Sequence, residues 1–171
     1  MVGARDGRKS WAFYIPIWCS FFNFQVEGQS QGSEPMNLLP LITDDITRIL
    51  IGIMEFTQSR QKLLTHNICE MRKPGFEPRD LAVDEFSESL NVAIEEYMRN
   101  NRLVFCDTKT IKFSLDGTVI AIPIADESSK ELLGNSPDEY LDLQMQRLME
   151  NAINQRVAAE LIRQRENAVM P

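Results

Sequence analysis

Between Met36 and the Pro-Gly pair at residues 74 and 75, apolar residues recur every three or four positions. This spacing places them on one side of an α-helix. Thr43, Asp44 and Asp45 precede the stripe and supply a cap and acidic residues for a first turn. The stripe would extend about 30 Å and is interrupted by one arginine. Its members are Ile46, Ile49, Ile53, Phe56, Arg60, Leu63 and Asn67.

A corner is predicted where this helix stops. Pro74 disfavours helical angles at Lys73, and Gly75 accepts backbone angles that other residues avoid. Phe76 follows the pair, and Pro78 keeps the next segment extended. The chain should therefore leave the helix sharply and continue as an extended segment.

The middle of the chain predicts a shorter helix and a hairpin. Residues 83–101 carry one apolar face, made of Phe86, Leu90, Ala93, Ile94 and Tyr97. Residues 110–124 then alternate between apolar and polar around Asp116-Gly117, which predicts a tight β-hairpin. Two strands alone are marginal, so the hairpin must pack on another element. Residues 125–139 are predicted to form a polar, turn-rich connector.

A second long helix is predicted from Leu141 to Val169. A neighbouring face adds Met149, Ile153, Val157 and Leu161, so the apolar surface is broad enough to need more than one neighbour. The predicted fold is mainly α, with long N- and C-terminal helices that pair as a coiled coil, a short central helix and a small β-hairpin. The main stripe, which Glu166 interrupts, consists of Leu141, Met145, Leu148, Ala152, Gln155, Ala159, Ile162 and Val169.

Residues 1–35 differ from the rest of the chain in composition, and we treat them as a separate leader segment. A charged start, an apolar run and a polar run imitate a secretory signal, although the apolar run is short and contains Pro16. The alternative is a misread start, with translation beginning at Met36. The expected segments are the leader 1–35, an N-terminal helix with its corner at 36–80, a variable middle at 81–135 and a C-terminal helix at 136–171.

Composition and charge restrict the function. The chain has 171 residues, of which 43% are hydrophobic and 25% charged, as in a folded soluble protein. The net charge is -7, and the acidity lies outside the leader, which argues against nucleic-acid binding.

Candidate chemistry is sparse. Cys19, Cys69 and Cys106 are odd in number and widely spaced, so we expect free, buried thiols and no metal site or disulfide framework. His66 is the only histidine, which excludes sites that need two. No glycine-rich phosphate loop occurs, and carboxylate pairs such as Glu95-Glu96 lie on polar faces. We expect neither an enzyme nor a cofactor.

Two stretches resemble one protein family. "SRQKLLTHNICEMRKPGFEPRDL", residues 59–81, resembles the N-terminal motif of flagellar basal-body rod proteins, in which a helix ending in Asn-Ile-Ala-Asn runs into Pro-Gly-Tyr or Pro-Gly-Phe. Arg79 to Leu81 are most similar to the proximal rod members. "LDLQMQRLMENAINQRVAAELI", residues 141–162, is similar to the family's closing helix, with matching positions at Leu141, Asp142, Met145, Leu148, Glu150 and Asn151. The chain departs from the pattern at Glu70, Arg72, Lys73 and Gln155.

The resemblance implies a structural subunit of a hollow rod. Such subunits associate with other rod subunits and with the ring and export-gate base of the basal body, and they leave the cell through the flagellar type III export apparatus without a cleaved signal. That route favours the start at Met36. The alternative function is a periplasmic or membrane-tethered helical adaptor with a true signal, and another rod protein of the same family is a closer rival. The expected assembly residues are Ile46, Ile49, Ile53, Phe56, Leu63, Asn67, Ile68, Pro74, Gly75, Phe76, Arg79, Asp80, Leu141, Met145, Leu148, Asn151, Ala152 and Ile162.

Overall fold

The computed structural model describes residues 39–114 and 118–169. The predicted leader, the start at Met36 and the Asp116-Gly117 turn lie outside the described residues. The described part is mainly helical, as predicted, with short antiparallel strand pairs.

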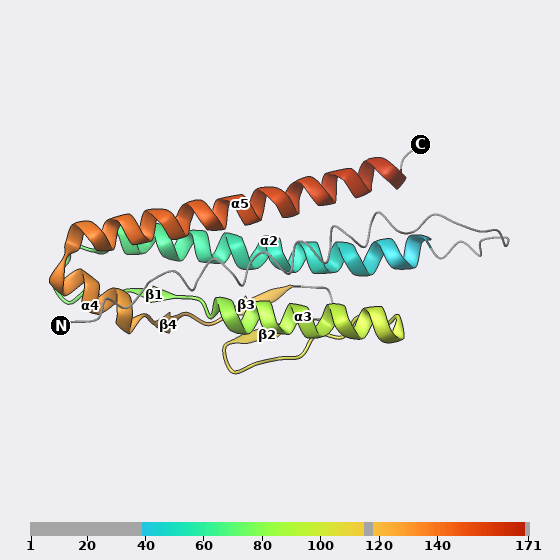
Figure 1. Cartoon of the computed structure of the whole chain (residues 1–171), viewed down its shortest axis with the longest axis horizontal. Coiled ribbons are helices and arrows are strands. Elements are labelled where there is room, and N and C mark those ends of the chain that lie inside the picture. The colour runs from blue at the N-terminus through green and yellow to red at the C-terminus, as the bar shows by residue number, and fades with distance from the viewer. Residues whose placement is uncertain (1–38, 115–117, 170–171) are drawn as a thin grey trace, which may run out of the picture. The chain divides into compact units, whose positions relative to one another are not determined.

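Two long helices, α2 (Leu39–Glu70) and α5 (Pro137–Val169), lie side by side and run in opposite directions (Figure 1). The cap predicted at residues 43–45 is wrong, because α2 already includes them. α5 begins four residues earlier than predicted. Pro137 suits its first position, where a backbone N–H has no partner within the helix.

The predicted corner is confirmed. α2 ends at Glu70, and the amide of Lys73 donates to the Glu70 carbonyl at 2.8 Å, which closes a turn. Gly75 has a φ of 76°, in the left-handed region that favours glycine. The extended segment that follows contains β1 (Arg79–Asp80).

The middle also follows the prediction. α3 (Val83–Asn100) buries Phe86, Leu90, Ala93 and Tyr97, and Ile94 is half-buried. β2 (Ile111–Phe113) and β3 (Val119–Ala121) pair antiparallel, with Lys112 opposite Ile120. A second antiparallel pair was not predicted. It joins β1 to β4 (Ile124–Ala125), with Asp80 opposite Ile124.

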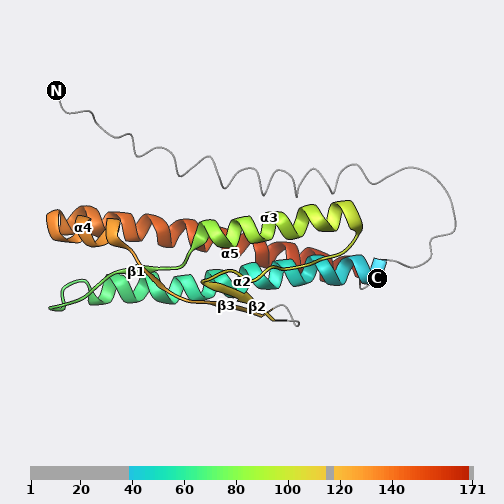
Figure 2. The ribbon, with the colours of Figure 1, turned by 90° about the horizontal axis from the view of Figure 1, so that it is seen from below.

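The predicted polar connector is wrong over most of its length, because it contains α4 (Glu127–Asn135). Asp126 caps this helix, since its carboxylate accepts a hydrogen bond from the Ser129 amide at 3.0 Å. Figure 2 shows α4 joined directly to α5 at the end of the two long helices where α2 finishes.

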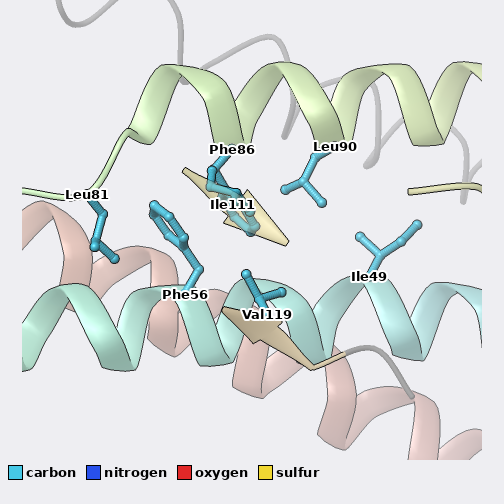
Figure 3. Packing of buried hydrophobic residues seen from close by; sticks show 7 residues of the cluster. All are labelled: Ile49, Phe56, Leu81, Phe86, Leu90, Ile111 and Val119. Carbon is cyan, nitrogen blue, oxygen red and sulfur yellow. The ribbon is translucent and has the colours of Figure 1, made fainter. Parts of the chain in front are cut away.

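The apolar core lies between α2, α3 and the β2–β3 hairpin (Figure 3). The rings of Phe56 and Phe86 stack with centroids 3.9 Å apart, and the Val119 amide donates to Glu55 at 2.6 Å. The hairpin therefore packs on other elements, as predicted. The cluster consists of Ile49, Phe56, Leu81, Phe86, Leu90, Ile111 and Val119.

This core corrects the partner expected for the N-terminal stripe. Ile49 and Phe56 face α3 and the hairpin, and Ile53 and Leu63 pack against the same cluster. The contact with α5 involves another side of α2, where Asn151 of α5 donates to the Thr57 carbonyl at 2.7 Å. Leu50 and Leu64 are buried one heptad to either side of Thr57, on the same side of the helix.

Candidate functional site

A buried polar cluster, which we name the corner network, joins the corner to α4 and α5. Its first part is the ion pair between Arg60 of α2 and Asp80 of β1. Arg60 Nε donates to Asp80 Oδ1 at 2.9 Å and Nη2 donates to Oδ2 at 2.8 Å, so the pair is bidentate. Both residues are buried. The network comprises Arg60, Asn67, Asp80, Asp126, Ser129, Gln144 and Arg147.

Arg147 of α5 extends the network to α4. Its Nη1 atom donates to Asp126 Oδ2 and, at 3.0 Å, to Ser129 Oγ. The same atom lies 3.7 Å from Asp80 Oδ2. Arg147 therefore bridges the acid of the corner and the acid that caps α4.

Asn67 connects the end of α2 to the segment beyond the corner. Its Nδ2 atom donates to the Arg79 carbonyl at 2.7 Å, and its Oδ1 atom accepts from the Arg79 amide at 3.4 Å. Nδ2 also lies 3.3 Å from Gln144 Oε1 of α5, and Gln144 in turn donates to Ser129 at 3.4 Å. These bonds hold the backbone beyond the corner against the end of α2.

The charges of the network balance, with two arginines facing two aspartates. Burial alone would raise the pKa of Asp126, but hydrogen bonds from Ser129, Arg147 and Ser128 outweigh it and hold that pKa well below its usual range. Burial raises the pKa of the neighbouring Tyr140 to about 12. The network thus contains ionised, hydrogen-bonded groups that fix three elements against the end of α2.

The side of α5 that faces α2 is not the side predicted. The buried residues are Tyr140, Gln144, Asn151 and Ala158, with Arg147 half-buried among them. Met145 and Ala152, which were expected on the internal stripe, are exposed. The predicted stripe is one residue out of phase, because it followed the apolar residues and the buried face is largely polar.

An exposed apolar stripe runs along the opposite side of α5. Met145 is 51% exposed, Met149 67% and Ile153 57%, and each lies four residues after the one before. We name these three residues the α5 stripe. A second exposed set, Ile120, Ile122 and Ile124, lies on β3, β4 and the residues between them.

The remaining predicted assembly residues separate into two groups. Pro74, Gly75 and Arg79 are exposed at the corner, and Phe76 is half-buried with its ring 6.3 Å from that of His66. The others lie inside or partly inside the protein. Ile46, Asn67, Asp80 and Asn151 are buried, whereas Ile68, Leu141, Leu148 and Ile162 are half-buried.

Groups with reactive chemistry are dispersed. His66 is exposed, and so are Cys69 and Cys106, which corrects the expectation of buried thiols; Cys19 lies outside the described residues. Within residues 39–114 and 118–169, no three His, Cys, Asp or Glu side chains gather as a metal site would require. In that same part of the chain, no helix has the length and apolarity needed to cross a membrane.

Four members of the network were missed from the sequence, namely Asp126, Ser129, Gln144 and Arg147. Asp126 followed by Glu127 carried the signal of a helix cap with an acidic first turn. Arg60, within an apolar stripe, indicated a buried acid somewhere else in the chain.

The chain matches no protein-family model, no curated protein and no solved structure.

Proposed function

We propose that this protein is a structural subunit of the bacterial flagellar basal-body rod, most similar to the proximal rod protein FlgB. In this proposal it catalyses no reaction and binds no cofactor. It reaches the periplasmic rod through the flagellar type III apparatus and contacts other rod subunits and the ring and export-gate base.

The observation that carries the proposal is the contact between the two stretches that resemble the family. Residues 59–81 and 141–162 are far apart in the chain, yet Asn67 of the first lies within hydrogen-bonding distance of Gln144 of the second. The Arg60–Asp80 pair lies within the first stretch and meets Arg147 of the second. A need to fix the geometry of the corner would explain why the residues that resemble the family lie where these two stretches meet.

The paired helices support an assembly role in a second way. α2 and α5 are long, antiparallel and joined by specific polar contacts, so the free apolar surface of α5 is presented on a rigid support. In the rod, we propose that α2 and α5 pair as a coiled coil and that the outer surface of α5 stacks on neighbouring subunits.

Deletion of the gene in its own bacterium tests this function. We expect loss of motility and basal bodies that lack a complete rod in electron micrographs. A plasmid copy of the full gene should restore both, and the chain should copurify with detergent-extracted basal bodies.

Motile deletion cells with complete rods would reject the proposal. If the chain were instead recovered in the periplasm or membrane fraction without basal bodies, the helical-adaptor alternative would replace it.

A further inference from the structure

The outward face of α5 changes character along its length. Asp138 and Asp142 are exposed near its N-terminal end, the α5 stripe follows, and Arg156 is exposed beyond it. An α-helix turns about 100° per residue, so Asp142, Met149 and Arg156, spaced by sevens, lie on one side. Asn151, two residues after Met149, lies roughly on the opposite side and contacts α2. This face therefore points away from the rest of the described structure.

On this face, apolar residues lie at equal distances on both sides of Met149, and charged residues of opposite sign lie farther out on the two sides. Met145 and Ile153 lie four residues to either side, and both are apolar. Asp142 and Arg156 lie seven residues to either side, about 10 Å along the helix, and carry opposite charges. Such a pattern is complementary to itself when one copy is turned end to end.

We propose that the α5 stripe binds the α5 stripe of a second copy of this chain, with the two helices antiparallel and Met149 at the twofold axis. Met145 of each copy then packs against Ile153 of the other. Asp142 of each copy faces the partner's Arg156, twice in the dimer. This is an isologous interface, in which the same surface is used by both copies.

A parallel arrangement is disfavoured by the same residues. With two α5 helices parallel and in register, Asp142 would face Asp142 and Arg156 would face Arg156, which places like charges opposite each other. The antiparallel arrangement has one unfavourable position, where Asp138 approaches Glu160. Glu160 already accepts hydrogen bonds from Arg163 and Gln164, so its charge is partly compensated.

The dimer does not rest on the proposed function. A closed antiparallel pair cannot extend into a tube whose subunits all point the same way. If the protein is a rod subunit, the dimer is its unassembled form, which covers the apolar stripe until assembly. Association of the purified chain and the motility of deletion cells are therefore separate tests.

Sedimentation of the purified full chain over a concentration series tests the interface. We expect a reversible monomer–dimer equilibrium, and loss of the dimer in Met149→Asp, which places two carboxylates at the axis. Asp142→Arg and Arg156→Asp should each weaken the dimer about tenfold, and the double variant should restore it because the charges match again. Ile122→Asp, in the other exposed apolar set, is the matched control and should leave dimerisation unchanged.

Disulfide trapping tests the direction of the helices. Cys19, Cys69 and Cys106 are first replaced by serine, and Met145→Cys and Ile153→Cys proteins are mixed under mild oxidation. The disulfide that joins position 145 of one chain to position 153 of the other should form in a larger amount than a disulfide between two identical variants. Any of three results would overturn the proposal. The chain could stay monomeric up to about 1 mM, the dimer could survive Met149→Asp, or the main disulfide could join position 145 of one chain to position 145 of the other.

Discussion

The two sides of α5 invert the usual distribution of polarity. Towards α2 and α4 the helix presents Gln144, Arg147 and Asn151, whereas towards solvent it presents Met145, Met149 and Ile153. Gln144 and Asn151 are almost fully buried and hydrogen-bonded. On the inward side, the hydrogen bonds fix how α5 is oriented against its neighbours, because each bond requires one particular partner. On the outward side, the described residues leave an apolar surface uncovered.

The inward side should be sensitive to the loss of single polar groups. The largest effect is expected for Asp80→Ala, which leaves Arg60 buried without its bidentate partner and removes a neighbour of Arg147. Breaking such a pair costs about 3–5 kcal/mol of the free energy of unfolding. Urea denaturation followed by circular dichroism measures it. Glu77→Ala is the control, because its ion pair with Lys130 is exposed and should matter little. If Asp80→Ala lowered the free energy of unfolding only slightly, the corner network would not be what stabilises the corner.

Asp126→Asn should lower the free energy of unfolding by about 3 kcal/mol at neutral pH, because Arg147 loses a charged partner. The difference also has a predicted pH dependence. The pKa of Asp126 is lower in the folded than in the unfolded chain, so its contribution is complete above the unfolded pKa of about 3.9 and is lost as the pH falls below it. Unfolding curves of wild type and variant should converge between about pH 5 and pH 2. A difference that stays constant over this interval would show that the charge of Asp126 is not responsible.

Asn67→Ala should cost about 2 kcal/mol, because the backbone of Arg79 loses both hydrogen bonds to the side chain. Hydrogen exchange at the Arg79 amide should become faster at the same time. The exposed Asn100, which bonds Glu96, provides the control variant Asn100→Ala. Equal effects of the two substitutions would contradict a special role for the corner.

These residues also show how far the sequence could predict the fold. Pro74-Gly75, the α3 face and the alternation of residues 110–124 depend on local backbone preferences. The structure agrees with the first two predictions, and it agrees with the third where residues 111–113 pair with residues 119–121. Asn67 belonged to the predicted stripe and to the family resemblance, whereas Asp80 was found through the resemblance alone, and both proved to be buried in the network.

The errors arose where tertiary contacts outweigh the hydrophobic pattern. In α5, apolarity selected Met145 and Ala152, whereas burial follows Gln144 and Asn151, whose hydrogen-bonding partners are on other elements. In α4, serines and charged residues suggested a loop, but Asp126 caps the helix and Ser129 is buried against Arg147. No periodicity within one segment reveals partners that lie elsewhere in the chain.

The outward side should tolerate polarity. Met149→Gln is expected to change the free energy of unfolding by no more than about 0.5 kcal/mol, as at other exposed positions, although it should weaken dimerisation. Urea denaturation at low protein concentration separates the two effects. A loss comparable to that of Asn67→Ala would mean that Met149 packs within the monomer.

The orientation of α5 is tested most directly by the reactivity of cysteines at two alanines of the same helix, after serine replaces the three native cysteines. Ala152 is exposed and Ala158 is fully buried. In dilute protein, Ala152→Cys should react with a thiol reagent nearly as fast as in urea, and Ala158→Cys should react at least about 100-fold more slowly, because reaction requires local opening. Equal rates, or faster reaction at Ala158→Cys, would contradict a helix with its polar side inside and its apolar stripe outside.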